Sequence, residues 1–189
     1  MNPKVTPISK IKGRHIDRLN QSIELLLKHC AYPATFLSIG EPNVFDKEVA
    51  GNNEIVNTVG DLDLRWKPEK DGKYDRVLCF EVMEHLTNPL SFLRKLKQYT
   101  TRESLVFVSI PNHLLRRHWR TLHFHEIDPV RFEYLCEQTG WQIVDRVCYK
   151  YWPKLSDITG VRPFIRYITG YSWFISRTDR WFYVLKHGK

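Results

Sequence analysis

The chain has 189 residues, of which 42% are hydrophobic, a length and composition that suit one domain (1–189) with a substantial core. No apolar run approaches the roughly 20 residues needed to cross a bilayer, and the first residues lack the apolar core of a signal peptide. These features exclude an integral membrane protein of the helical kind and favour a cytoplasmic one. The formal net charge is +8.

The first third of the chain predicts a helix and two strands. Residues 1–14 are basic and contain prolines, and we interpret them as an arm. Apolar residues recur at helical spacing from His15 to Cys30, which predicts an amphipathic helix. A short strand follows from Thr35 and runs into a turn at Gly40, and residues 54–63 read as a second strand that ends in acids. Alternation of strand and helix indicates a parallel sheet.

The segment after Tyr74 is the most informative part of the chain. Val77–Phe80 is a short apolar run typical of a buried strand, and Asn88 with Pro89 opens a helix with leucines on one face. The corner between them contains Glu81, Glu84 and His85. In an open α/β sheet, ligands bind outside the carboxyl ends of the strands, so this corner is where we expect chemistry.

The second half predicts three more strands and a helix. Residues 104–110 form the clearest buried strand, which we expect Pro111 and Asn112 to end. After a basic loop, Asp128 and Pro129 begin a helix that Gly140 ends. Residues 141–149 and 181–185 then read as an antiparallel edge hairpin with a long insertion, residues 152–178.

Four cysteines are widely spaced, without a C-x-x-C pair. Three of them fall inside apolar patterns, where a reduced thiol behaves as a small core hydrophobe. Neither a disulfide nor a zinc site is therefore expected.

This order of elements resembles the class I S-adenosylmethionine-dependent methyltransferases, in particular the small Methyltransf_11 and Methyltransf_23 types. The segments that carry the resemblance are residues 36–40, 60–63, 74–89, 105–112 and 125–132, with Gly140-Trp141. The resemblance implies an α/β fold: a Rossmann-like, doubly wound, mostly parallel sheet with an antiparallel C-terminal edge hairpin. Only ten residues separate Asp63 from Tyr74, so we expect the sheet to be shortened in the middle.

The resemblance also implies S-adenosylmethionine as the cofactor and a methyl transfer to oxygen or nitrogen. The residues that would bind the cofactor are Gly40, Glu41, Asp61, Asp63, Phe80, Glu81 and Val82. Asp61 lies 21 positions after Gly40, near the offset at which such folds place an acid against ribose hydroxyls, and Asp63 is the fallback.

The first motif departs from the family pattern, which is an acid followed by Ile-Gly-x-Gly-x-Gly. Ser38 stands in place of the acid, and Gly40-Glu41-Pro42-Asn43 keeps a single glycine. A proline fixes φ and removes an N–H, so the turn cannot copy the usual backbone cradle. The alternative is therefore a catalytically inactive protein that kept the methyltransferase fold for binding.

The histidines after the fifth strand are the predicted catalytic groups. His123 or His125 would take a proton from the attacking hydroxyl or amine, and Glu126 would orient the imidazole. A second alternative is a metal-assisted RNA 2'-O-methyltransferase, because Glu-x-x-Glu-His also occurs in the small-RNA enzymes of that kind. Its metal ligands would be Glu81, Glu84 and His85, with His125 or His123 as the later histidine.

The C-terminal segment bears on the kind of substrate that the protein binds. Between Arg146 and Lys189, nine Lys or Arg stand against two Asp, and apolar residues from Phe164 to Ile175 can form one helical face. Such a segment suits an anionic membrane surface or a phosphorylated substrate, or it is a lid packed on its own domain. We expect a small-molecule, glycan or lipid-linked substrate and peripheral membrane contact. Nucleic acid is not favoured, because no RNA or DNA module is recognised.

Overall fold

The computed structural model describes residues 23–29, 33–40, 44–113, 123–150 and 178–188. The predicted basic arm (1–14) and nearly all of the predicted insertion (152–178) lie outside these ranges, as do residues 15–22 of the first predicted helix. Residues 23–29 are helical, in agreement with the amphipathic pattern. In the described part of the chain, none of the helices is long and apolar enough to span a membrane.

The centre of the fold is a seven-stranded sheet with the order β3-β2-β1-β4-β5-β7-β6. Neighbours among β2, β1, β4 and β5 pair in parallel, whereas β7 is antiparallel to both β5 and β6. This arrangement confirms the expected Rossmann-like sheet and its antiparallel C-terminal hairpin. The strands are β1 (Phe36–Ser38), β2 (Ile55–Gly60), β3 (Trp66–Pro68), β4 (Arg76–Phe80), β5 (Leu105–His113), β6 (Trp141–Lys150) and β7 (Thr178–His187).

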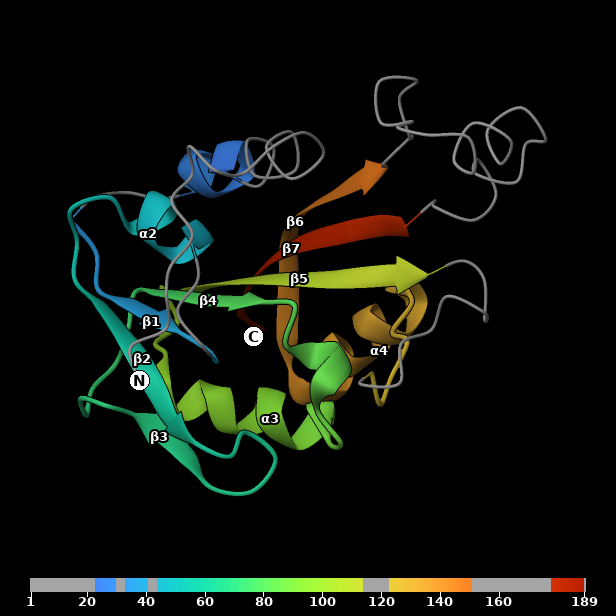
Figure 1. Cartoon of the computed structure of the whole chain (residues 1–189), viewed down its shortest axis with the longest axis horizontal. Helices are drawn as coiled ribbons and strands as arrows, with labels where there is room; N and C mark the ends of the chain where they lie inside the picture. Colours follow the sequence, from blue (N-terminus) through green and yellow to red (C-terminus); the bar gives the residue numbers. More distant parts are fainter. Residues whose placement is uncertain (1–22, 30–32, 41–43, 114–122, 151–177, 189) are drawn as a thin grey trace, which may run out of the picture.

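Helices cover both faces of the sheet. Helix 23–29 and α2 (Val44–Ala50) lie on one face, and α3 (Pro89–Leu96) and α4 (Pro129–Thr139) lie on the other (Figure 1). Each face buries its own apolar cluster. The smaller cluster joins Leu26 and Val49 to Phe107, and the larger one joins Leu93 and Phe132 to the other side of the same strands. The doubly wound arrangement follows from strands that are apolar on both faces.

The shortening falls on β3, at the edge of the sheet and not in its middle as expected. This strand has three residues, runs antiparallel to β2 and forms the edge of the sheet. No helix lies between β3 and β4. The short interval after Asp63 therefore leaves room for only a minimal edge strand.

The end of β5 differs from the prediction. Pro111 and Asn112 were expected to end this strand, but it continues to His113. Pairing with β4 stops at Ser109, whereas pairing with β7 continues through Pro111 to His113. Proline is tolerated where a strand has a neighbour on one side only, so it does not stop β5 there.

The helix boundaries near the site agree with the sequence signals. Asn88 caps α3, where its side chain accepts a hydrogen bond from Ser91 N at 2.9 Å, and Asp128 caps α4 in the same way through Arg131 N. Gly140 ends α4 in the left-handed conformation with φ 67°. Of the predicted inward face of α3, Leu93 and Leu96 are buried and Leu90 is partly buried, with Phe92 as a further buried residue.

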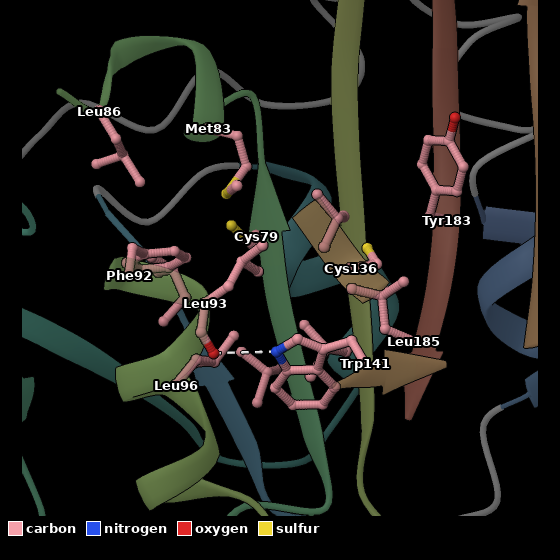
Figure 2. Packing of buried hydrophobic residues seen from close by; sticks show 14 of the residues in the cluster. Cys79, Met83, Leu86, Phe92, Leu93, Leu96, Cys136, Trp141, Tyr183 and Leu185 are labelled. Carbon is pink, nitrogen blue, oxygen red and sulfur yellow. Dashed lines mark hydrogen bonds between the residues drawn. The ribbon is translucent and has the colours of Figure 1, made fainter. Parts of the chain in front are cut away.

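Helix α3 is fixed to the start of β6 by a buried tryptophan. The indole Nε1 of Trp141 donates to the carbonyl oxygen of Leu93 at 3.0 Å, as Figure 2 shows, and Lys97 lies over the same ring. Trp66 provides a natural comparison. Its ring is also buried below a lysine, Lys95, but its Nε1 has no hydrogen-bond partner.

We predict that Trp141→Phe destabilises the fold more than Trp66→Phe. Both changes remove a similar apolar area, but only the first leaves a buried carbonyl without its indole donor, at a cost of about 1–3 kcal/mol. The free energy of unfolding from urea titration measures the difference. Equal losses in the two variants would show that the Trp141 hydrogen bond contributes nothing.

Candidate active site

The strand order defines where a ligand can bind. The chain proceeds from β1 outward through β2 to β3, and then resumes on the opposite side of β1 with β4 and β5. Open α/β sheets form a crevice outside the carboxyl ends of the strands at this reversal. Gly40 follows β1 and Glu81 follows β4, so the two predicted motifs meet at one place.

Gly40 shapes the β1 side of this crevice. It has φ +88°, a conformation that favours glycine, and its N–H donates to Thr58 Oγ1 at 3.0 Å. A Cβ on Gly40 would lie 3.6 Å from Val82 Cγ2, so Gly40 and Val82 are neighbours across the reversal. Glu41 lies outside the described residues.

A buried carboxylate remains beside the end of β1 although residue 38 is not acidic. Ser38 Oγ donates to Asp46 Oδ2 at 2.7 Å, and both residues are buried. Asp46 lies in the first turn of α2. No sequence signal predicts this pair, because Asp46 lies outside the family motif.

The two candidate acids after β2 have different environments. Asp63 accepts hydrogen bonds from the N–H groups of Thr87 and Asn88 at 2.8 and 3.0 Å. Although its partial burial opposes the change, these bonds hold the pKa of Asp63 below its usual value. Asp61 is exposed and accepts from Asp63 N at 2.9 Å. Asp63 therefore fixes the loop before α3, and Asp61 is the acid exposed to a ligand.

Glu81, which follows β4, connects the end of this strand to β5 and β7. It is the one non-glycine residue of the described chain with positive φ, 57°, a conformation that costs energy unless its surroundings hold it. Its N–H donates to the carbonyl oxygen and to Oγ of Ser109, at 3.3 and 3.1 Å. Its carboxylate accepts from Ser109 Oγ at 3.2 Å and pairs with the guanidinium of Arg180.

Residues next to Glu81 are held by the core. Phe80 is partly buried and packs against the cluster on the α2 face. The 3-10 helix η2 (Met83–His85) follows, and Met83 and Leu86 are buried in the larger cluster (Figure 2). These anchors fix the corner so that Glu84 is turned inward while His85 is exposed.

Glu84 is a buried carboxyl group. The residue is 2% exposed, and its Oε2 has no hydrogen-bond partner. Burial, together with the nearby charge of Glu81, raises the pKa of Glu84 to about 8. Glu84 is therefore protonated at neutral pH.

The structure brings His123 to this corner. Suitable ligand atoms of Glu84, His85 and His123 all lie within 4.8 Å of one another, and the two imidazole rings meet edge to face at a centroid distance of 4.9 Å. His123 Nδ1 lies 3.1 Å from Glu126 Oε1, and the two side chains are 6% and 10% exposed. The second carboxylate oxygen of Glu126 has no partner.

His125 is close to this cluster but points elsewhere. Its N–H donates to the carbonyl oxygen of Glu84 at 3.2 Å, and its Nε2 lies 3.2 Å from the carbonyl oxygen of Thr87. The backbone of His125 thus connects the loop after β5 to η2. Of the two predicted histidines, His123 is the one that Glu126 orients.

Arg180 and Ser109 were not among the predicted site residues. Arg180 lies in β7, 99 residues after Glu81, and no local pattern connects them. Ser109 sits on the α2 face of β5, where the sequence reads as a continuous apolar strand. Both depend on strand pairing that the sequence alone does not specify.

The fold and the strand-end site together define a class I methyltransferase architecture, and comparison with known proteins agrees. The Methyltransf_23 family, described as a methyltransferase domain, matches residues 15–146. The chain belongs to this family. The expected enzyme class, methyltransferase, and the expected cofactor, S-adenosylmethionine, agree with this assignment.

Solved structures show the same fold. A protein of Bacillus halodurans C-125 assigned as a methyltransferase has a TM-score of 0.63 at 12% identity, covering 88% of this chain and 99% of that one. The [4+2]-cyclase SpnF has a TM-score of 0.61 at 10% identity, covering 97% and 86%.

Coclaurine N-methyltransferase, solved with N-methylheliamine and S-adenosylhomocysteine, has a TM-score of 0.57 at 14% identity, covering 98% of this chain and 76% of that one. At these identities the likeness concerns the fold alone. A search of curated proteins finds no match.

We predict that the stability of the wild-type protein falls relative to Glu84→Gln as pH rises from 5 to 8.5. The folded pKa of Glu84, about 8, lies above the ordinary value of 4.5. Between these values the folded state binds the extra proton, so rising pH favours unfolding, by at most about 1.4 kcal/mol per pH unit. The glutamine variant has no proton to lose at this position.

Urea titrations of both proteins at several pH values, with EDTA present, measure the effect. Other titrating groups contribute equally to both proteins and cancel in the difference. A difference in unfolding free energy that stays constant across this range would contradict the raised pKa.

Proposed function

We propose that this protein transfers a methyl group from S-adenosylmethionine to an oxygen or nitrogen nucleophile of a small-molecule, glycan or lipid-linked substrate. The observation that carries the proposal is the largely buried His123–Glu126 pair beside the strand-end corner. An imidazole oriented by a carboxylate suits proton removal from a hydroxyl or amine. The cofactor supplies an electrophilic methyl group on a sulfonium sulfur.

The residues at the reversal fit such a cofactor. Gly40 has no side chain, so the cofactor can approach the backbone closely on the β1 side. The exposed Asp61 suits hydrogen bonds from ribose hydroxyls. Asp46 adds a buried carboxyl group on the β1 side, which favours a cationic sulfonium over a neutral group. Glu84, protonated at neutral pH, adds a buried polar group on the β4 side. Glu81, neutralised by Arg180, holds the corner in shape.

His123 is the base in this proposal, and Glu126 is a positioning residue. The contact between Nδ1 and Glu126 Oε1 at 3.1 Å fixes the ring orientation. An attacking oxygen or nitrogen needs alignment with the methyl–sulfur bond and a group that accepts its proton. His125 maintains the loop through its contacts with Glu84 and Thr87.

The test follows label from methyl-tritiated S-adenosylmethionine into small-molecule, glycan, lipid and RNA fractions of a cell extract. We predict label in one of the first three, and a loss on the order of a hundredfold or more in His123→Asn. The dissociation constant for S-adenosylhomocysteine, measured by calorimetry, should stay within about twofold, because a base contributes mainly to the reaction step.

His29→Asn is the matched control. His29 pairs with Asp145 in β6, and the variant should keep full activity. Binding of S-adenosylhomocysteine without transfer to any fraction would favour the inactive binding protein instead. Full activity in His123→Asn would remove His123 as the base.

One observation favours a second candidate, a metal-assisted RNA 2'-O-methyltransferase. The cluster of Glu84, His85 and His123 offers one carboxyl group and two imidazoles, a donor set that suits a borderline divalent ion once the ion displaces the proton of Glu84. Glu81 is already bound to Ser109 and Arg180, so it does not belong to this cluster. Label in the RNA fraction that disappears with EDTA and in Glu84→Ala would support this candidate.

A further inference from the structure

A hollow of about 410 Å³ lies beside the His123–Glu126 pair. Its walls come from the start of α3, the loop before α4 and α4 itself, and are mainly apolar, with Phe124, Ile127, Tyr134 and Leu135 among them. The volume falls within the range of small-molecule sites, roughly 300–1,000 Å³.

Two aromatic side chains of this hollow are unusually exposed. Phe124 is 66% exposed and Tyr134 is 59% exposed. Exposed aromatic side chains on one concave surface indicate a binding function more than an isolated exposed residue does. Pro89, at the first position of α3, extends the apolar wall.

Glu126 connects the hollow to the proposed catalytic pair. One carboxylate oxygen, Oε1, contacts His123, whereas Oε2 is buried and has no partner. The side chain is 10% exposed, and the residue lines the hollow. A buried carboxylate oxygen without a partner costs free energy, and a ligand that brings a donor removes this cost.

We propose that this hollow is the acceptor subsite, and that it binds an aromatic ring whose hydroxyl or amino group donates a hydrogen bond to Glu126 Oε2. The hydrogen stays on that group, and His123 remains the base for the nucleophile. The inference rests on the proposed function and names its substrate class. Phe124 and Tyr134 provide apolar contact for the ring, and Glu126 sets its orientation relative to His123. Arg131, at 73% side-chain exposure and paired with Asp128, lies at the solvent side of the lining.

The test uses two probes with the same ring, 4-methylphenol and its methyl ether 4-methylanisole, in ligand-observed NMR titrations without cofactor. We expect the phenol to bind about tenfold more tightly than the ether, because only the phenol donates a hydrogen bond to the carboxylate. Phe124→Ala and Tyr134→Ala should each weaken phenol binding about fivefold or more, since each removes one aromatic wall.

Leu64→Ala is the matched control, because Leu64 is 76% exposed and does not line the hollow. It should bind both probes as the wild type does. Equal affinity for phenol and ether, or phenol binding unchanged in both aromatic variants, would overturn the subsite. A wild-type dimer that Phe124→Ala and Tyr134→Ala dissociate would also overturn it, because a second copy would then cover the hollow.

Calorimetry with S-adenosylhomocysteine on the same samples separates the two proposals. Failure of the phenol to bind, with S-adenosylhomocysteine still bound, rejects the subsite alone. Absence of S-adenosylhomocysteine binding rejects the proposed methyl transfer, whatever the probes do.

Discussion

The site depends on how Glu81 is held at the end of β4. Its positive φ turns the chain out of the strand and into η2. Ser109 in β5 and Arg180 in β7 bind its backbone and its carboxylate, so two neighbouring strands hold this residue at the end of β4. Met83 and Leu86, which follow Glu81, are buried in the core and hold η2 in place. The positions of Glu84, His85 and, through the His125 backbone, His123 follow from it.

Local signals account for the parts that the sequence predicted well. The caps Asn88, Asp128 and Gly140 act within three or four residues, and the apolar runs of β4 and β5 identify central strands without knowledge of their partners. The parts that it missed depend on distant pairing. Pro111 does not end β5 because β7 continues beside it, and Arg180 reaches Glu81 because β7 lies next to β5. His123 and His125 are equivalent in sequence, and their contacts distinguish them: His123 pairs with Glu126, whereas the His125 ring lies against the carbonyl oxygen of Thr87.

The first motif shows how a fold can keep a site while its sequence pattern changes. Ser38 lacks the family's acid, yet it donates to the buried Asp46 on α2. A carboxylate thus lies beside the end of β1, supplied by the next helix. Gly40, the one glycine of the motif that remains, has positive φ and lies next to Val82. A cofactor can therefore still approach the backbone closely at this position. The structure therefore favours a retained cofactor site over a fold that has lost it.

The most direct test of this account is a crystal structure with S-adenosylhomocysteine. We predict that the cofactor lies over the Gly40 turn and beside Val82, with its ribose hydroxyls at Asp61 and its sulfur facing the corner of Glu84 and His123. Cofactor density at another place, or a crevice that stays empty at millimolar ligand while the protein is folded, would contradict it.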